Sequence, residues 1–171
     1  MKNLSIKFKS YVAAGIFVVI GVLLDQWTKS LAVAGLKGQK PIILIDKVFQ
    51  LCYLENRGAA FGIFQNRITF FLISTPIILI IMIWLYGRFP EGKRYLPLRI
   101  CSAAICAGAI GNMIDRVRLG YVIDFFYFNL IDFPIFNVAD IYVTVSTFAL
   151  LFLVFFYYRE EDLEQIFKRR K

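Results

Sequence analysis

The chain has 171 residues, of which 59% are hydrophobic and 17% are aromatic. This composition is typical of a protein that lies mostly in lipid, so it predicts an integral membrane protein. The absence of histidine excludes Ser-His and Cys-His nucleophile pairs and histidine-containing zinc sites. Because the basic residues flank apolar stretches, the net charge of +8 favours contact with anionic lipid and not with nucleic acid.

Four apolar stretches without Asp, Glu, Lys or Arg predict four transmembrane helices, because a bilayer needs about 20 such residues. The stretches are 11–24, 68–86, 100–114 and 141–158. The first and third are short, so the expected spans are extended to 11–34, 67–86, 98–116 and 138–158. A cleavable signal peptide is the alternative for the first stretch, but no Ala-x-Ala-like site follows it.

Between the first two spans, Phe49, Leu51 and Tyr53 alternate with more polar neighbours. This period of two is typical of a strand. We expect a small extracytoplasmic sheet within residues 41–64 at the membrane surface, with Gly58 and Gly62 at turns or close approaches of the backbone. No repeats or flexible linkers interrupt the chain, so a single domain, 1–171, is expected.

Lysine and arginine in the loops favour a topology with both termini and residues 87–99 in the cytoplasm. Residues 36–66 and 117–137 are then outside. This topology gathers several polar pairs at the outer ends of the spans: Asp25 with Lys29, Asn56 with Arg57, Asn112 with Asp115 and Arg116, and Asn137 with Asp140. An Asp at mid-bilayer costs about 2.5–3.5 kcal/mol, whereas a hydrogen bond contributes only about 0.5–1.5 kcal/mol. So many carboxylates on one side therefore suggest a functional site.

Structural roles are the alternative for each of these residues. Asn137 and Asp140 have the spacing of a helix N-cap pair, and Asp25 and Lys29 that of an ion pair on one helix face. Asp115 next to Arg116 is compatible with an interfacial salt bridge. Other residues are expected to have solvation or packing roles only: Asp132 in its loop, the three cysteines, and the Gly and Ala residues at 103, 104, 107, 108 and 111.

Asp124 is the hardest carboxylate to explain by structure alone, because it lies among large apolar residues in the loop after the third span. Only 16 positions separate it from Asp140, so the loop is expected to bring the two carboxylates within a few ångström. Two carboxyl groups that share a site do not both ionise easily, so one remains an acid while the other acts as a base.

Five segments resemble, in order, the motifs of the lipoprotein signal peptidases, the signal peptidase II family. They are Asp25-Gln-Trp-Thr-Lys29, Asn56-Arg-Gly-Ala-Ala-Phe-Gly62, Gly111-Asn-Met-Ile-Asp-Arg116, Val122-Ile-Asp-Phe125 and Phe136-Asn-Val-Ala-Asp140. Together they cover residues 25–140. The chain departs from the family pattern in two places: the loop between the two aspartates is on the short side, and the tail after Tyr158 is charged.

The resemblance implies an α-helical integral membrane protein with four transmembrane helices and an extracytoplasmic sheet. It implies a catalytic pair at Asp124 and Asp140 that cleaves before the diacylglyceryl-modified cysteine of prolipoproteins, without a metal or cofactor. Further motif positions are implied to support the site or bind substrate: Asp25, Lys29, Asn56, Gly58, Asn112, Asp115, Arg116 and Asn137. The expected partners are lipid-modified prolipoproteins and membrane lipid, and the expected location is the bacterial inner membrane, as a monomer.

Two other functions remain open from the residues alone. Intramembrane carboxylates also mark ion paths, so a small proton-coupled transporter subunit is one alternative, although such a protein would place charge near the midplane. A non-catalytic membrane scaffold is the other, and it would tolerate the loss of Asp124 or Asp140.

Overall fold

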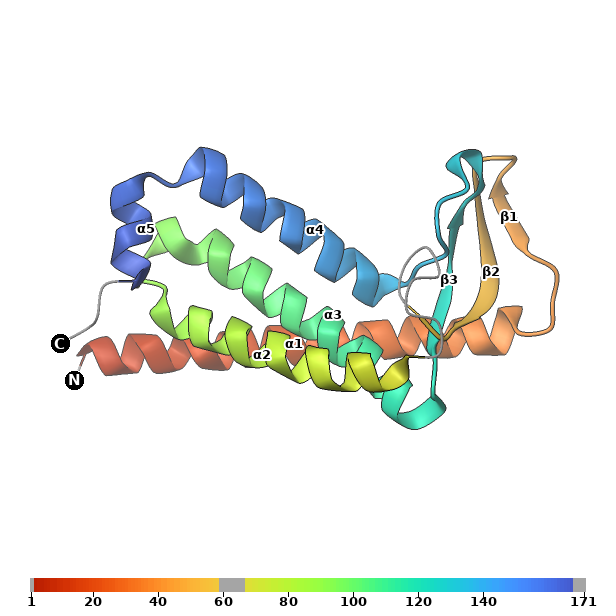
Figure 1. Cartoon of the computed structure of the whole chain (residues 1–171), viewed down its shortest axis with the longest axis horizontal. Coiled ribbons are helices and arrows are strands. Elements are labelled where there is room, and N and C mark those ends of the chain that lie inside the picture. The colour runs from red at the N-terminus through yellow and green to blue at the C-terminus, as the bar shows by residue number, and fades with distance from the viewer. Residues whose placement is uncertain (1, 59–66, 168–171) are drawn as a thin grey trace.

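The structure is a computed structural model that describes residues 2–58 and 67–167, with side chains from Ile6 onward. Four of its helices are long and apolar enough to cross a membrane. They are α1 (Lys2–Leu36), α2 (Ile68–Arg88), α3 (Leu96–Leu119) and α4 (Val138–Phe152), the last together with the helical turn that continues it to Tyr157. The helices lie side by side, with a small sheet at one end and both termini at the other (Figure 1). The predicted fold class is confirmed.

Helix α3 is the centre of the bundle, because α1, α2 and α4 all pack against it. Small residues make this possible: Ala107 is fully buried, and a Cβ atom at Gly108 would collide with the backbone of Ala139 in α4. A Cβ atom at Gly111 would lie 2.5 Å from Oδ2 of Asp25 in α1. The predicted small-residue face therefore brings the polar ends of α1 and α4 close to α3.

The sheet is antiparallel, with strand order β1-β2-β3, and consists of β1 (Ile42–Ile45), β2 (Phe49–Asn56) and β3 (Val122–Phe128). β2 confirms the strand predicted from alternation. The loop predicted around Asp124 is wrong, because this residue lies within β3. Residues 59–64 of the expected sheet, with Gly62, fall outside the described residues.

The pairing of β2 with β3 contains an irregularity close to Asp124. Leu51 pairs with Phe126 and Leu54 with Asp124, so three steps along β2 correspond to two along β3. One extra residue in β2 is thus accommodated as a bulge. After β3, the 3₁₀ turn η3 (Asn129–Ile131) leads toward α4.

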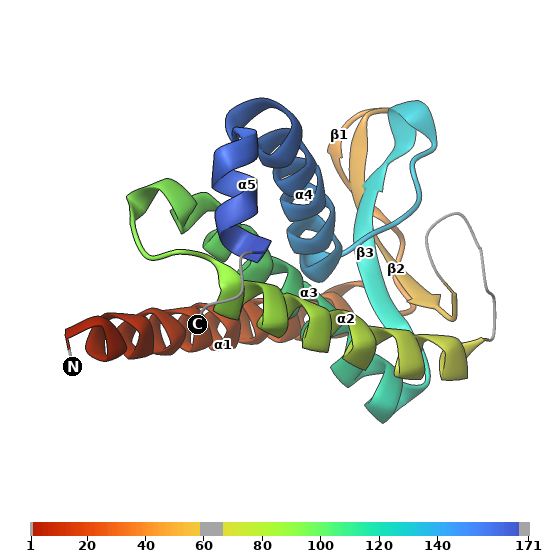
Figure 2. The same cartoon turned by 60° about the vertical axis from the view of Figure 1, so that its left-hand side comes forward.

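The other end of the bundle contains a helix that was not predicted. α4 continues as one π-helical turn, η4 (Leu153–Tyr157), and then α5 (Glu160–Phe167) folds back (Figure 2). Ile166 and Tyr158 are buried with residues around the turn between α2 and α3, which contains η2 (Lys93–Tyr95). Arg94 also forms an ion pair with Asp162. The described part of the charged tail, residues 159–167, is therefore held against the bundle.

Candidate active site

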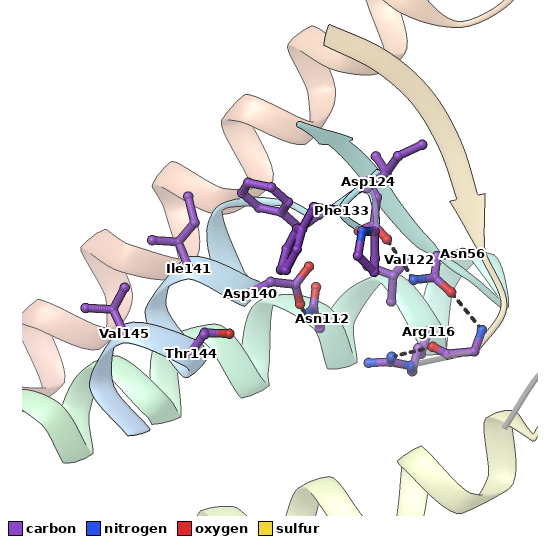
Figure 3. A pocket seen from close by; sticks show the side chains of 14 residues that line it. Asn56, Asn112, Arg116, Val122, Asp124, Phe133, Asp140, Ile141, Thr144 and Val145 are labelled. Atoms are coloured by element: carbon purple, nitrogen blue, oxygen red, sulfur yellow. Dashed lines mark hydrogen bonds between the residues drawn. The ribbon is translucent and has the colours of Figure 1, made fainter. Parts of the chain in front are cut away.

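A cavity of about 260 Å³ opens where β3 and the start of α4 meet α3. Its polar wall contains Asp124, Asp140, Asn56, Asn112 and Arg116. Its apolar wall contains Val122, Phe133, Pro134, Ile135, Phe136, Ile141 and Val145. Figure 3 shows Asp124 entering this space from β3 and Asp140 from the first turn of α4. The strand and the helix thus bring the two aspartates of the sequence analysis to one cavity.

Asp124 is 1% exposed and is held by two amide groups. Its Oδ1 accepts a hydrogen bond from Nδ2 of Asn137 at 2.7 Å, and its Oδ2 accepts one from Nδ2 of Asn56 at 2.7 Å. These two hydrogen bonds fix the orientation of the Asp124 carboxylate at the edge of the cavity.

Asp140 is the third residue of α4 and takes part in a capping box with Asn137. Its Oδ2 accepts from the backbone N of Asn137 at 3.1 Å, and its Oδ1 accepts from Nδ2 of Asn112 at 2.8 Å. The structure therefore contains the N-cap that the sequence offered as the structural role of this pair. The same carboxylate nevertheless lines the cavity, so capping and a role in the site are compatible.

Asn112 and Asn137 connect the two aspartates. Nδ2 of Asn137, which bonds Asp124, also lies 3.1 Å from Oδ1 of Asn112, and Nδ2 of Asn112 bonds Asp140. One continuous chain of side-chain hydrogen bonds thus runs from β3 through α3 to α4. Asn137 itself is fully buried, which excludes water from the middle of this chain.

The surroundings of Asp124 favour its protonated form. Burial is the main cause that raises the pKa of Asp124, to about 7, and the charge of Asp140 adds to it. Hydrogen bonds from Asn56 and Asn137 and the charge of Lys29 act in the opposite direction. A carboxyl group whose pKa lies near neutrality can exchange a proton during a reaction at physiological pH.

Asp25, Lys29 and Asp115 form a buried ionic cluster behind this chain. The predicted ion pair of Asp25 with Lys29 is present at 2.9 Å, but Lys29 also lies 2.9 Å from Oδ2 of Asp115. Asp25 additionally accepts from the backbone N of Ala139 at 3.0 Å, which ties α1 to the start of α4. Gln26, which was not among the predicted site residues, donates to Asp115 at 2.8 Å. The sequence around Gln26 predicts only a helix, and it does not indicate the contact with Asp115.

Arg116 does not have the partner that the sequence suggested. Within the described residues, no ion pair joins it to Asp115, because Asp115 turns toward Lys29 in α1. Arg116 instead donates to the backbone O of Gly58 at 3.3 Å and lies over the Phe71 ring at 4.2 Å. It therefore holds the chain just after β2 at the edge of the cavity.

The remaining candidates lie away from the cavity lining. Asp132 is exposed and accepts from the Tyr127 hydroxyl at 2.6 Å, and the three cysteines are free thiols. Among residues 2–58 and 67–167, no group of three Cys, Asp or Glu side chains is arranged to hold a metal ion.

Comparison with known proteins gives consistent results. The family model described as "Signal peptidase (SPase) II" matches residues 17–156. A lipoprotein signal peptidase from Clostridium tetani is 40% identical over 87% of this chain and 94% of its own length. A lipoprotein signal peptidase from Streptococcus thermophilus is 43% identical over 90% of this chain and 96% of its own length.

Solved structures agree with the sequence comparisons. A bacterial membrane enzyme determined by the in meso method at 2.3 Å resolution superposes with a TM-score of 0.73. It is 31% identical and covers 93% of each chain. A second such structure, at 1.9 Å resolution, gives a TM-score of 0.73 and 32% identity over 85% of this chain and 94% of its own. The family resemblance predicted from the five motifs is confirmed.

Proposed function

This chain belongs to the signal peptidase II family, and we propose that it removes signal peptides from diacylglyceryl-modified prolipoproteins, with Asp124 and Asp140 as its catalytic pair. One observation carries the residue assignment: the buried Asp124 and the partly buried Asp140 line one cavity and are joined through Asn112 and Asn137. The chain is a multi-pass bacterial membrane protein, and we propose that its cavity faces the extracytoplasmic side.

In the proposed reaction, the ionised carboxylate of the pair takes a proton from a water molecule that attacks the scissile carbonyl carbon. The protonated partner donates a hydrogen bond to the carbonyl oxygen and later protonates the leaving nitrogen. General acid-base assistance of this kind contributes about 10²- to 10⁴-fold to the rate. The near-neutral pKa of Asp124 supports a pair that holds a single proton at physiological pH.

The apolar wall of the cavity supports a lipid-bearing substrate. Ile141 and Val145 lie one turn apart on α4 and face the cavity beside Phe133 (Figure 3). This surface continues from the carboxylates along a membrane-spanning helix. An apolar signal peptide with an acylated cysteine presents its scissile bond at the same depth.

The position of the charged residues favours a peptidase over a proton-coupled transporter. The ionic cluster and the two aspartates lie at the end of the helices that meets the sheet, whereas an ion path needs charge near the middle of the spans. The proposal thus places the reaction at the interface and not inside the bilayer.

Substitution of the two aspartates tests this proposal. We expect Asp124→Asn and Asp140→Asn to insert into the membrane as the wild type does and to cleave a lipidated precursor at least about 10²-fold more slowly. Asp132→Asn is the matched control, because this exposed carboxylate accepts from Tyr127 and does not line the cavity formed by the described residues. Cleavage by either dyad variant at the wild-type rate would overturn the assignment and support the scaffold alternative.

A further inference from the structure

Lys29 has an unusual environment for a lysine, because its side chain lies in the interior of the protein beside the proposed catalytic pair. It is 1% exposed, and its Nζ lies 2.9 Å from Asp25 Oδ2, 2.9 Å from Asp115 Oδ2 and 2.8 Å from Asn112 Oδ1. An ammonium group has three donors and no acceptor, so all three donors are used. The bonds to Asp25 and Asp115 form an ion-pair cluster that stabilises the fold. The third bond, to Asn112, connects Lys29 to the residues that line the cavity.

The third bond determines how the Asn112 amide is oriented. Because an ammonium group only donates, the atom of Asn112 that faces Lys29 must be the oxygen. The NH₂ group of Asn112 then points the other way, to Asp140 Oδ1 at 2.8 Å. If the amide turned over, it would place an NH₂ group against the ammonium and an oxygen against the carboxylate.

The same oxygen of Asn112 also orients Asn137. It accepts from Asn137 Nδ2 at 3.1 Å, so the NH₂ group of Asn137 faces Asp124 at 2.7 Å. The Asn137 oxygen is then left to accept from the backbone N of Asp140 at 3.0 Å. Each amide in this chain of hydrogen bonds has one orientation that satisfies all of its neighbours, and the ammonium group of Lys29 determines that orientation.

Building on the proposed function, we propose that Lys29 is a positioning residue for the aspartate pair. Its ammonium group fixes the amide orientation of Asn112, and through Asn112 that of Asn137, so that both carboxylates receive an amide N–H. Lys29 touches neither aspartate of the pair in this arrangement, and it acts on both through one neutral amide chain.

Lys29 also contributes a charge to the site. Its ammonium group lies between two carboxylates, so the cluster has a formal net charge of −1, which becomes −2 when Lys29 is replaced by an uncharged residue. The charged groups that act on Asp124 are Asp140 from α4, Arg116 from α3 and Lys29 from α1, and Lys29 is itself paired with Asp25 and Asp115. Among these, Lys29 lowers the pKa of Asp124. Loss of the charge is therefore expected to move the titration of the pair to higher pH.

The test compares purified wild type, Lys29→Met and Lys29→Met/Asp115→Asn on a lipidated precursor over a range of pH. The double variant removes one carboxylate with the lysine, which restores the net charge of −1 and separates folding from positioning. Lys37→Met is the matched control, because Lys37 directly follows the same helix but pairs with Glu55 at the surface. Thermal unfolding in detergent reports the fold of each protein.

We expect the double variant to unfold near the wild-type temperature and to have a kcat about 10- to 100-fold lower, with little change in KM, as for residues that orient a reacting group. In Lys29→Met, both limbs of the pH profile should lie at higher pH. If the double variant is recovered unfolded, Lys29→Gln tests the charge of Lys29, because its amide keeps a donor while the net charge of the cluster becomes −2. It should shift both limbs in the same direction.

The outcomes separate this inference from the proposed function. Wild-type kcat and pH profile in a folded Lys29→Met/Asp115→Asn or Lys29→Gln variant would overturn the positioning role and leave the peptidase intact. Absence of cleavage by both the wild type and Lys37→Met would overturn the proposed function, and the positioning role with it.

Discussion

Asn137 and Asp140 exchange hydrogen bonds at the start of α4: each side chain accepts from the backbone N of the other, at 3.0 Å and 3.1 Å. The exchange has a consequence for the cavity. Because the Asn137 oxygen is used by the cap, its NH₂ group is available to Asp124. The signal that begins a transmembrane helix therefore also orients a ligand of the neighbouring carboxylate.

The raised pKa of Asp124 predicts how the stability of the fold depends on pH. Its pKa is about 7 in the folded state against a usual value of 3.8, so the folded protein binds more protons between these values than the unfolded chain does. The free energy of unfolding should then fall as pH rises from about 4 to 7. Asp124→Asn should weaken this dependence and raise the melting temperature most at pH 8.

Thermal unfolding in detergent at pH 5 and pH 8, at one scan rate, measures this effect. Asp132→Asn is the control, since its carboxylate is exposed. An equal drop in melting temperature between the two pH values for wild type and Asp124→Asn would contradict the burial of an ionisable Asp124.

Gly111→Ala should destabilise the bundle by about 1–3 kcal/mol, because the added Cβ would lie 2.5 Å from Oδ2 and 3.0 Å from Cγ of Asp25. This carboxylate is held by Lys29 and by the backbone N of Ala139, so it cannot move away without breaking those contacts. Gly15→Ala is the control. At that position no heavy atom of the described residues, apart from its own helix neighbourhood, lies within 4 Å. Equal melting temperatures for the two variants would argue against close packing of α1 on α3.

The topology predicted from loop charges places Lys93 in the cytoplasm and Asn129 outside. Figure 1 shows the two turns that contain them at opposite ends of the bundle. Lys93→Cys and Asn129→Cys, each in a chain without its three native cysteines, should react with a membrane-impermeant thiol reagent from opposite sides. Labelling of both from the same side would exclude this topology.

Cleavage should depend on the lipid of the substrate. Each buried CH₂ group contributes about 0.8 kcal/mol, so acyl chains against the apolar surface near Ile141 and Val145 can hold the scissile bond at the level of the carboxylates. Purified protein in detergent should therefore cut a lipidated precursor far faster than an unlipidated precursor of identical sequence. Equal rates would indicate a general intramembrane protease instead.

The sequence was sufficient to predict the four helices, because long apolar runs in membranes have few alternative structures. It was also sufficient to place β2, whose side chains alternate. It failed for β3, because residues 122–128 are apolar on both faces apart from Asp124, and such a run shows no period of two. α5 was missed because half of its eight residues are acidic and its burial depends on Ile166 and on contacts across the chain.

In the site, residue identities were predictable but partners were not. The spacing of Asp25 and Lys29 predicts an ion pair, and the structure adds Asp115 from a helix more than 80 residues away. A salt bridge of Arg116 with its neighbour Asp115 was one alternative from the sequence, yet successive helix positions point to different faces, and Arg116 contacts Gly58 instead. Long-range partners of this kind depend on tertiary packing, which single-sequence patterns do not contain.

The bulge between Leu51 and Leu54 in β2 accommodates one extra residue, whereas the regular pairing beyond it sets a strict limit on insertions and deletions. Side chains alternate between the two faces of a strand, so a shift of one residue between Leu54 and Asn56 would turn the Asn56 side chain away from Asp124 and the cavity. Loss of Glu55 should therefore lower the activity of the protein even if the sheet still forms. The turn at 38–41 lies outside this pairing, so changes of its length should leave the carboxylates where they are.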